Sequence, residues 1–226
     1  YAGKYLLEAT CRYEASTRFA PEDRWGFFPT IALGWRISEE NFFKNNINPD
    51  IFDDFKLRTS MGLTGNDNGV ALSWENNYVY AGNVSYLGGT STTGGISPNL
   101  GGLSMSGITW EKSRNINAGF DARFLKNLTL GFDAFYRHSY DILQQRSSAL
   151  SYTSGLGTNI PKENYGIQNS WGGELSLNYN KQINKDWSYN VRVNMDYASS
   201  RVVRKIQAPA ILGTWKDEEG RIAGGE

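Results

Sequence analysis

Apolar and polar residues alternate along several segments of this chain, and this period of two constrains the fold more than any other feature. In segment 187–197, Trp187, Val191 and Met195 fall on one side, while Arg192 and Asp196 fall on the other. Successive side chains of a strand point to opposite faces of a sheet, whereas a helix repeats every ~3.6 residues. The alternation therefore predicts strands with one apolar and one polar face.

The pattern recurs along the chain in segments of about ten residues. The predicted strands are 4–13, 27–37, 55–64, 114–124, 128–137, 171–180 and 187–197. Strands of soluble proteins usually have about five or six residues, whereas a tilted strand that crosses a bilayer needs about nine to eleven. The sequence thus predicts an all-β fold, an antiparallel transmembrane β-barrel fragment of about seven long strands.

The predicted connections alternate in length, as they do in outer-membrane barrels, which have short periplasmic turns and long extracellular loops. The short connections are 125–127 and 181–186, the long ones are 14–26, 65–109 and 138–170, and the intermediate one is 38–54. On this rule every long loop lies outside the cell. We expect a short helix within 38–54 and a small hairpin around 76–87.

Composition excludes several functions. The 226 residues carry 23 basic and 23 acidic side chains, a balance that does not indicate a nucleic-acid partner. A mean hydropathy of −0.50 fits a barrel, because lumen-facing polar residues offset the lipid-facing apolar ones. The single histidine, His138, has no clear partner spacing for a catalytic triad. We predict no enzyme activity, no cofactor and no metal site.

A series of short motifs resembles the SusC/RagA family of TonB-dependent outer-membrane importers. Each motif alone is weak, and their order and spacing over about 180 residues make the resemblance specific. The motifs are KYLLEAT at 4–10, STRFA at 16–20, WGFFP at 25–29, GWRISEE at 34–40, FKLR at 55–58, GLTGN at 62–66, ITWEK at 108–112, GFD at 119–121, NYG at 164–166 and GGEL at 172–175. Near the first loop the chain departs from the family pattern, with Arg-Tyr-Glu-Ala-Ser at 12–16.

The resemblance implies a protein of the cell outer membrane that imports oligosaccharides or peptides. Residues 1–226 would be part of one TonB-dependent receptor β-barrel domain of 22 strands, with the plug domain, the TonB box and the final strands outside them. The implied partners are a SusD-like surface lipoprotein and TonB, the latter through the missing N-terminal region. The substrate itself is not specified by the sequence.

Two groups of residues are candidates for functional contacts. Charges on the polar faces are expected to face the lumen, where they either pair across strands and hold the plug or line the substrate path; we favour pairing. These lumen-facing candidates are Arg58, Asp121, Arg123, Asp133, Glu174, Arg192 and Asp196. The possible ligand-contacting loop aromatics are Trp74, Tyr78, Tyr80, Tyr86 and Tyr152, although plain loop packing also explains them.

A third group of aromatic residues lies on the apolar faces, mostly near strand ends, as in the interfacial girdles of membrane proteins. It comprises Tyr5, Tyr13, Trp35, Tyr136, Trp171, Trp187 and Tyr197. Two other interpretations remain. A soluble secreted carbohydrate-binding β-sandwich predicts strands of about five or six residues around one apolar core. A small porin-like barrel predicts a complete, even set of strands.

Overall fold

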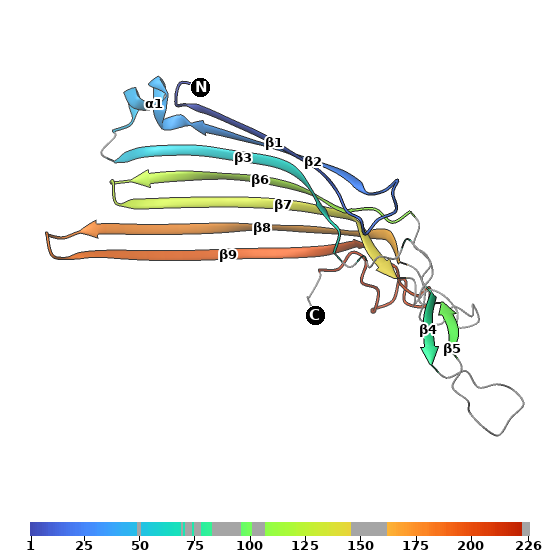
Figure 1. Ribbon diagram of the computed structural model, residues 1–226. Coiled ribbons are helices and arrows are strands. Elements are labelled where there is room, and N and C mark those ends of the chain that lie inside the picture. The colour runs from blue at the N-terminus through green and yellow to red at the C-terminus, as the bar shows by residue number, and fades with distance from the viewer. Residues whose placement is uncertain are drawn as a thin grey trace, which may run out of the picture.

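Seven antiparallel strands form one curved sheet in the computed structural model, in the order β1-β2-β3-β6-β7-β8-β9 (Figure 1). The structure describes residues 1–48, 51–68, 70, 74, 78–82, 96–100, 107–145 and 162–222. The strands are β1 (Tyr5–Ala15), β2 (Trp25–Arg36), β3 (Phe52–Asn66), β6 (Glu111–Phe124), β7 (Leu128–Gln145), β8 (Lys162–Gln182) and β9 (Ser188–Arg204). Each strand follows its neighbour in sequence, apart from the small separate pair β4–β5, so the sheet is an up-and-down meander.

The seven strands predicted from alternation are confirmed, but the predicted length of ten residues is too short. β7 has 18 residues and β8 has 21, because both continue into the expected loop 138–170. The register shifts there, between Ser139 and Leu143, and Asp141 adopts a positive φ of 58°. A bulge of this kind interrupts the alternation, which explains why the sequence pattern fades before the strands end.

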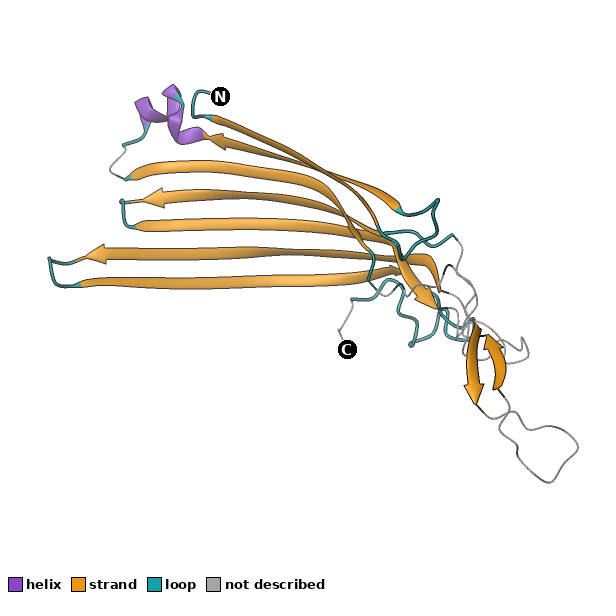
Figure 2. Ribbon diagram, in the orientation of Figure 1, coloured by secondary structure: helices purple, strands orange, loops and turns teal. Residues whose placement is uncertain are grey.

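Connections at one end of the sheet, here called the turn end, are compact (Figure 2). A 3-10 helix, η1 (Ile37–Glu39), and a short α1 (Asn41–Asn46) fill the connection predicted at 38–54. The β6–β7 hairpin turns through Leu125 and Lys126, which have φ values of 51° and 62°. Neither helix of the described chain is long and apolar enough to cross a membrane.

The opposite end, here called the loop end, carries the longer connections (Figure 1). Between β3 and β6 lies a separate hairpin of β4 (Tyr78–Gly82) and β5 (Ile96–Leu100). Only the first strand of this hairpin, β4, lies within the expected range 76–87. The second strand, β5, lies further along the chain. After β9, Ile222 forms a bridge with Arg201 on the outer edge of that strand.

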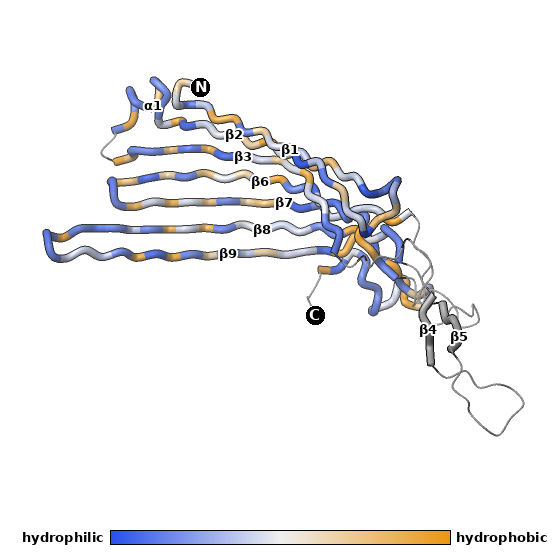
Figure 3. The backbone as a smooth tube through the Cα atoms, viewed as in Figure 1, coloured by the Kyte–Doolittle hydropathy of each residue, from blue (hydrophilic) through white to orange (hydrophobic). Residues whose placement is uncertain are grey.

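Hydropathy alternates along the strands of the sheet (Figure 3), and most side chains on both faces stay accessible. The main buried apolar cluster lies at the loop end, where Phe28 on the polar face of β2 packs against Trp110 at a ring distance of 5.3 Å. The remaining buried members of this cluster are Phe19, Val70 and Ile108. This small core joins two loops to the sheet and does not cover the sheet.

Candidate membrane face and lumen face

One face of the sheet presents a continuous apolar surface that no described part of the chain covers. The exposed fraction is 52% for Val191 and 64% for Met195 on β9, and 70% for Trp187, which directly precedes this strand. The described residues contain no second sheet packed against this face, so they lack the two-layer core of a β-sandwich. An apolar face of this size on a water-soluble protein would be expected to bind a partner or to aggregate.

Aromatic residues border this face at both ends. At the turn end, Tyr5 stacks on Trp35 with 6.5 Å between ring centroids, and at the loop end Tyr13 stacks on Trp25 at 4.7 Å. Near the opposite edge of the sheet, on β9 and β8, Tyr189 packs against Tyr179 at the turn end. The two borders have the composition of the aromatic girdles at membrane–water interfaces.

The two aromatic borders shift together across the sheet. By strand register, Tyr197 of β9 lies level with Leu7 of β1, so the loop-end border moves six residues from Tyr13. Met195 lies level with Tyr5, and the turn-end border moves the same six residues to Tyr189. A shift of about one residue per strand corresponds to a strand tilt of roughly 35°.

The two aromatic borders are also separated by the same number of residues at both edges of the sheet. Tyr5 and Tyr13 are eight positions apart, as are Tyr189 and Tyr197. Eight residues along a strand tilted by roughly 35° give an apolar band about 22 Å tall. Transmembrane barrels have strands tilted by about 35–45° and an apolar band about 25 Å tall. The face therefore has the dimensions of a lipid-facing barrel wall.

The opposite face is polar and carries an ion-pair network centred on Arg58 of β3. Its guanidinium lies 2.8 Å from Asp121, measured from Nε to Oδ2, and its Nη2 donates to Asp133 at 3.0 Å. Gly119 lies between Arg58 and Asp133 in the register, and a Cβ there would lie 2.3 Å from the Asp133 carboxylate. Because this position has no side chain, the arginine can reach two strands away.

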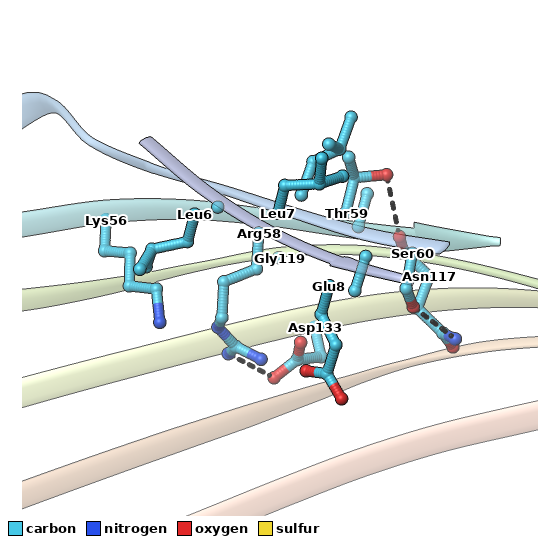
Figure 4. Close-up of a pocket in the computed structure, with 14 residues that line it drawn as sticks. Leu6, Leu7, Glu8, Lys56, Arg58, Thr59, Ser60, Asn117, Gly119 and Asp133 are labelled. Atoms are coloured by element: carbon cyan, nitrogen blue, oxygen red, sulfur yellow. Dashed lines mark hydrogen bonds and ion pairs between the residues drawn. The ribbon is translucent and has the colours of Figure 1, made fainter. Parts of the chain in front are cut away.

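A pocket of about 420 Å³ lies beside this network. In Figure 4, Glu8, Lys56, Arg58 and Asp133 point to one side of the sheet, whereas Leu7 and Thr59 point to the other. Asn117 also lines the pocket and donates to the Ser60 hydroxyl at 3.2 Å. The pocket wall thus presents charged and neutral polar groups on the polar face of the sheet.

The predicted lumen-facing charges divide into two sets. Arg123 joins the paired set, since its Nε lies 2.7 Å from Asp53. Glu174, Arg192 and Asp196 have no ion-pair partner among the residues that the structure describes. Asp133, Glu174 and Asp196 lie directly opposite one another on three adjacent strands. Pairing across strands therefore holds for part of the predicted group.

The structure places the predicted loop aromatics only in part. Trp74 is half-buried, with the Arg24 guanidinium 5.3 Å from its ring centroid, so it packs against the first loop. Tyr78 and Tyr80 lie on β4, while Tyr86 and Tyr152 fall outside the described residues. Whether any of them contacts a ligand stays a prediction.

Sequence reasoning missed two sets of anchoring contacts. At the loop end, Trp110 Nε1 donates to the Arg24 carbonyl at 2.9 Å, and Arg24 Nε donates to the Phe19 carbonyl at 3.0 Å. At the turn end, the Glu40 carboxylate accepts hydrogen bonds from three side chains of β1, β2 and the preceding turn. These donors are Tyr5 Oη at 2.7 Å, Lys4 Nζ at 3.0 Å and Trp35 Nε1 at 3.2 Å.

A meander of long tilted strands, with a girdled apolar face and a charged polar face, defines a segment of transmembrane β-barrel wall. Residues 1–223 match the family described as TonB dependent receptor-like, beta-barrel. The chain belongs to this family and is a SusC/RagA-type TonB-dependent receptor segment. The predicted family and fold are thereby confirmed, and the sheet is not closed within these residues.

Individual relatives agree with this assignment. The chain is 32% identical to the TonB-dependent receptor SusC of Bacteroides thetaiotaomicron over 214 residues, which is 89% of this chain and 19% of that protein. It is 27% identical to the TonB-dependent receptor P3 of Formosa agariphila, over 90% of this chain and 19% of that protein. It thus spans about a fifth of the length of these relatives.

A solved structure shares the fold. The RagAB peptide transporter superposes with a TM-score of 0.72 at 23% identity, over 89% of this chain and 21% of that chain. At this identity the likeness concerns the fold alone.

Proposed function

We propose that residues 1–226 are part of the single β-barrel domain of an outer-membrane, TonB-dependent importer of oligosaccharides or peptides. The observation that carries this proposal is the pair of aromatic borders, which shift equally across the sheet and bound an apolar band of membrane height. The family membership supplies the transport class. No bond is made or broken in this function, and the chain acts as wall and loop scaffold.

The polar face would border the aqueous passage. The ion pairs of Arg58 with Asp121 and Asp133 fix the side chains of three strands, β3, β6 and β7. Glu174, Arg192 and Asp196, which have no ion-pair partner in the described part of the chain, would leave charges available to the interior. These groups would keep the passage wetted and bind the plug or the passing substrate, which deepens the expectation drawn from the sequence.

The loop end would face the cell exterior, in accordance with the length of its connections. In this orientation the long loops and the candidate aromatics meet the substrate first, and a SusD-like surface lipoprotein would cover them. Sugar rings and peptide side chains both pack on aromatic rings, so this chemistry suits either substrate class. TonB would act from the periplasm through a part of the protein outside residues 1–226.

Growth of the source bacterium tests the proposal. The full-length gene is deleted, and growth is measured on a panel of oligosaccharides and oligopeptides, each as sole carbon source. We expect the deletion strain to lose growth on at least one of these substrates. Return of the full-length gene should restore this growth, but it should not do so in a strain that also lacks TonB. Unchanged growth on every substrate, or restoration without TonB, would contradict the proposal.

A further inference from the structure

A row of basic and amide side chains crosses the outer, apolar face of the sheet just beyond the loop-end girdle. Arg114 of β6, His138 of β7, Asn169 of β8 and Arg201 of β9 lie directly opposite one another in the strand register. On each strand this residue lies two positions closer to the loop end than the residue of the neighbouring row on the same face. The neighbouring row comprises Ile116, Tyr136, Trp171 and Ser199. Because side chains alternate, the row lies on the same face as the apolar band.

The two arginines of this row have no counter-charge among the residues that the structure describes. Arg114 and Arg201 are exposed, and in the described part of the chain no carboxylate lies within ion-pair distance of either. Arg114 has only a ring contact, with its guanidinium 5.3 Å from the centroid of Tyr140. By contrast, Arg58 and Arg123 on the inner face are ion-paired. The outer row therefore keeps its charge for a partner.

The other two members of the row are held together. His138 Nδ1 lies 2.7 Å from Asn169 Oδ1, so the ring nitrogen donates to the amide oxygen. No hydrogen bond of the Asn169 amide nitrogen is present among the described residues, so this nitrogen can donate to a ligand. The row thus presents a guanidinium at each end and an amide donor between them. Arg114 and Arg201 are separated by three strand spacings, about 14 Å.

The position of the row identifies its surroundings. A guanidinium within the hydrocarbon layer is costly, so basic side chains on a lipid-facing surface belong at the level of the headgroups. Tyr136, Trp171 and Tyr197 mark the edge of the apolar band. His138 and Asn169 lie two positions beyond Tyr136 and Trp171, and Arg201 lies four positions beyond Tyr197. Planar guanidinium groups bind phosphate oxygens in pairs. The charge of the row is complementary to phosphate, and its surface is continuous with the acyl-chain surface below.

We propose that Arg114, Asn169 and Arg201 bind the phosphate headgroup of an anionic lipid in the leaflet at the loop end, with the acyl chains of that lipid against Ile116, Tyr136 and Trp171. This proposal rests on the proposed membrane placement of the barrel. The two can fail separately, because embedding depends on the apolar band and headgroup binding depends on the basic row.

The test uses the full-length receptor in nonionic detergent, titrated with diphosphoryl lipid A, with bound lipid counted by native mass spectrometry. We expect the double variant R114Q/R201Q to bind lipid A about tenfold more weakly, since each basic residue near a membrane surface contributes substantially to binding anionic lipid. The matched control is R137Q/R192Q, which removes two arginines from the inner face of the same sheet and should change the affinity less than about twofold.

Three results would overturn the proposal: unchanged binding by R114Q/R201Q, equal loss by the control pair, or displacement of lipid A by an equal concentration of inorganic phosphate. If R114Q/R201Q does not fold, R114K/R201K keeps the charge and should retain affinity within about threefold, while R201Q alone should still weaken binding. Quenching of tryptophan fluorescence by brominated phosphatidylcholine tests embedding independently. Quenching without a lipid A difference would refute the headgroup site and leave the barrel placement intact.

Discussion

Arg58 and Asp133 are joined by a 3.0 Å ion pair that spans two strands and crosses above Gly119. The same guanidinium also holds Asp121, so one cation satisfies two carboxylates on adjacent strands. The contact links residues 75 positions apart in the sequence. It connects β3, β6 and β7 on the polar face of the sheet.

Loss of this cation should destabilise the barrel. In R58Q the carboxylates of Asp121 and Asp133 repel each other without a counter-charge, and we expect the free energy of unfolding to fall by about 1 kcal/mol, because the groups are partly exposed. Urea unfolding of the full-length receptor in detergent measures it. R192Q is the control, since Arg192 has no ion-pair partner among the described residues, and an equal loss in both variants would refute the role of the network.

A methyl group at Gly119 should disturb the same network by crowding. Its Cβ would lie 2.3 Å from the Asp133 carboxylate and 2.5 Å from the Phe132 carbonyl oxygen, which is backbone and cannot move freely. We expect G119A to lower the free energy of unfolding by about 1–3 kcal/mol. G173A is the matched control, because its nearest neighbour would be 3.5 Å away. Equal stability of the two variants would contradict the geometry.

The loop-end cluster should hold the loops at this end to the sheet. Phe28 is 5% exposed, so F28A removes a buried ring. The free energy that holds the loop-end cluster together should fall by about 3–5 kcal/mol. We expect faster proteolysis of the loops between β1 and β2 and between β3 and β6. Its neighbour Phe27 is 55% exposed on the other face, and F27A should leave the cleavage rate close to that of the unaltered protein. Similar protection in both variants would refute the anchor.

Glu40 should make the turn end sensitive to acid. Hydrogen bonds from Tyr5, Lys4 and Trp35 lower the pKa of Glu40 from 4.5 to about 2. A lowered pKa in the folded state gives stability that is fully present above pH 4.5 and is lost as the pH falls through about 2. At pH 6 the midpoint temperature of thermal unfolding should thus be lower for E40Q than for the unaltered protein. Near pH 2 the two midpoint temperatures should approach each other.

The control for this pH dependence is E8Q. Glu8 lies on β1 and has no ion-pair partner in the part of the chain that the structure describes. Its substitution should give a small difference that does not depend on the Glu40 contacts. A difference between E40Q and the unaltered protein that stays constant from pH 6 to pH 2 would contradict the assignment.

The sequence contains much of the fold because period-two alternation is a local property of each strand. Trp187, Val191 and Met195 are assigned to one face from spacing alone, and the exposed apolar face confirms this. Strand ends are less predictable: the loop-end extensions of β7 and β8 mix polar residues with apolar ones such as Ile142 and Ile167, and the bulge at Asp141 breaks the period. Hydropathy therefore marks the membrane-spanning part and misses the extensions.

Contacts between distant strands are not encoded in local patterns. Which carboxylate Arg58 reaches depends on the register of three strands and on the absence of a side chain at Gly119. The burial of Phe28 depends likewise on loops that fold back from positions 19 and 110. Phe28 is an apolar residue on the polar face of segment 27–37, and such an exception to the alternation is the sequence signal for this cluster.

The placement of the barrel wall is decided by which face of the sheet meets lipid. Cys11 is the single cysteine of the 226 residues, and it is replaced by serine in the test protein. The measurement places a spin label at each position from 189 to 197 of β9, in this full-length receptor reconstituted into phospholipid vesicles, and records accessibility to oxygen and to a water-soluble nickel complex. We expect accessibility to alternate, with Tyr189, Val191, Val193, Met195 and Tyr197 accessible to oxygen and the intervening positions accessible to nickel. The reverse alternation, or none, would contradict this placement.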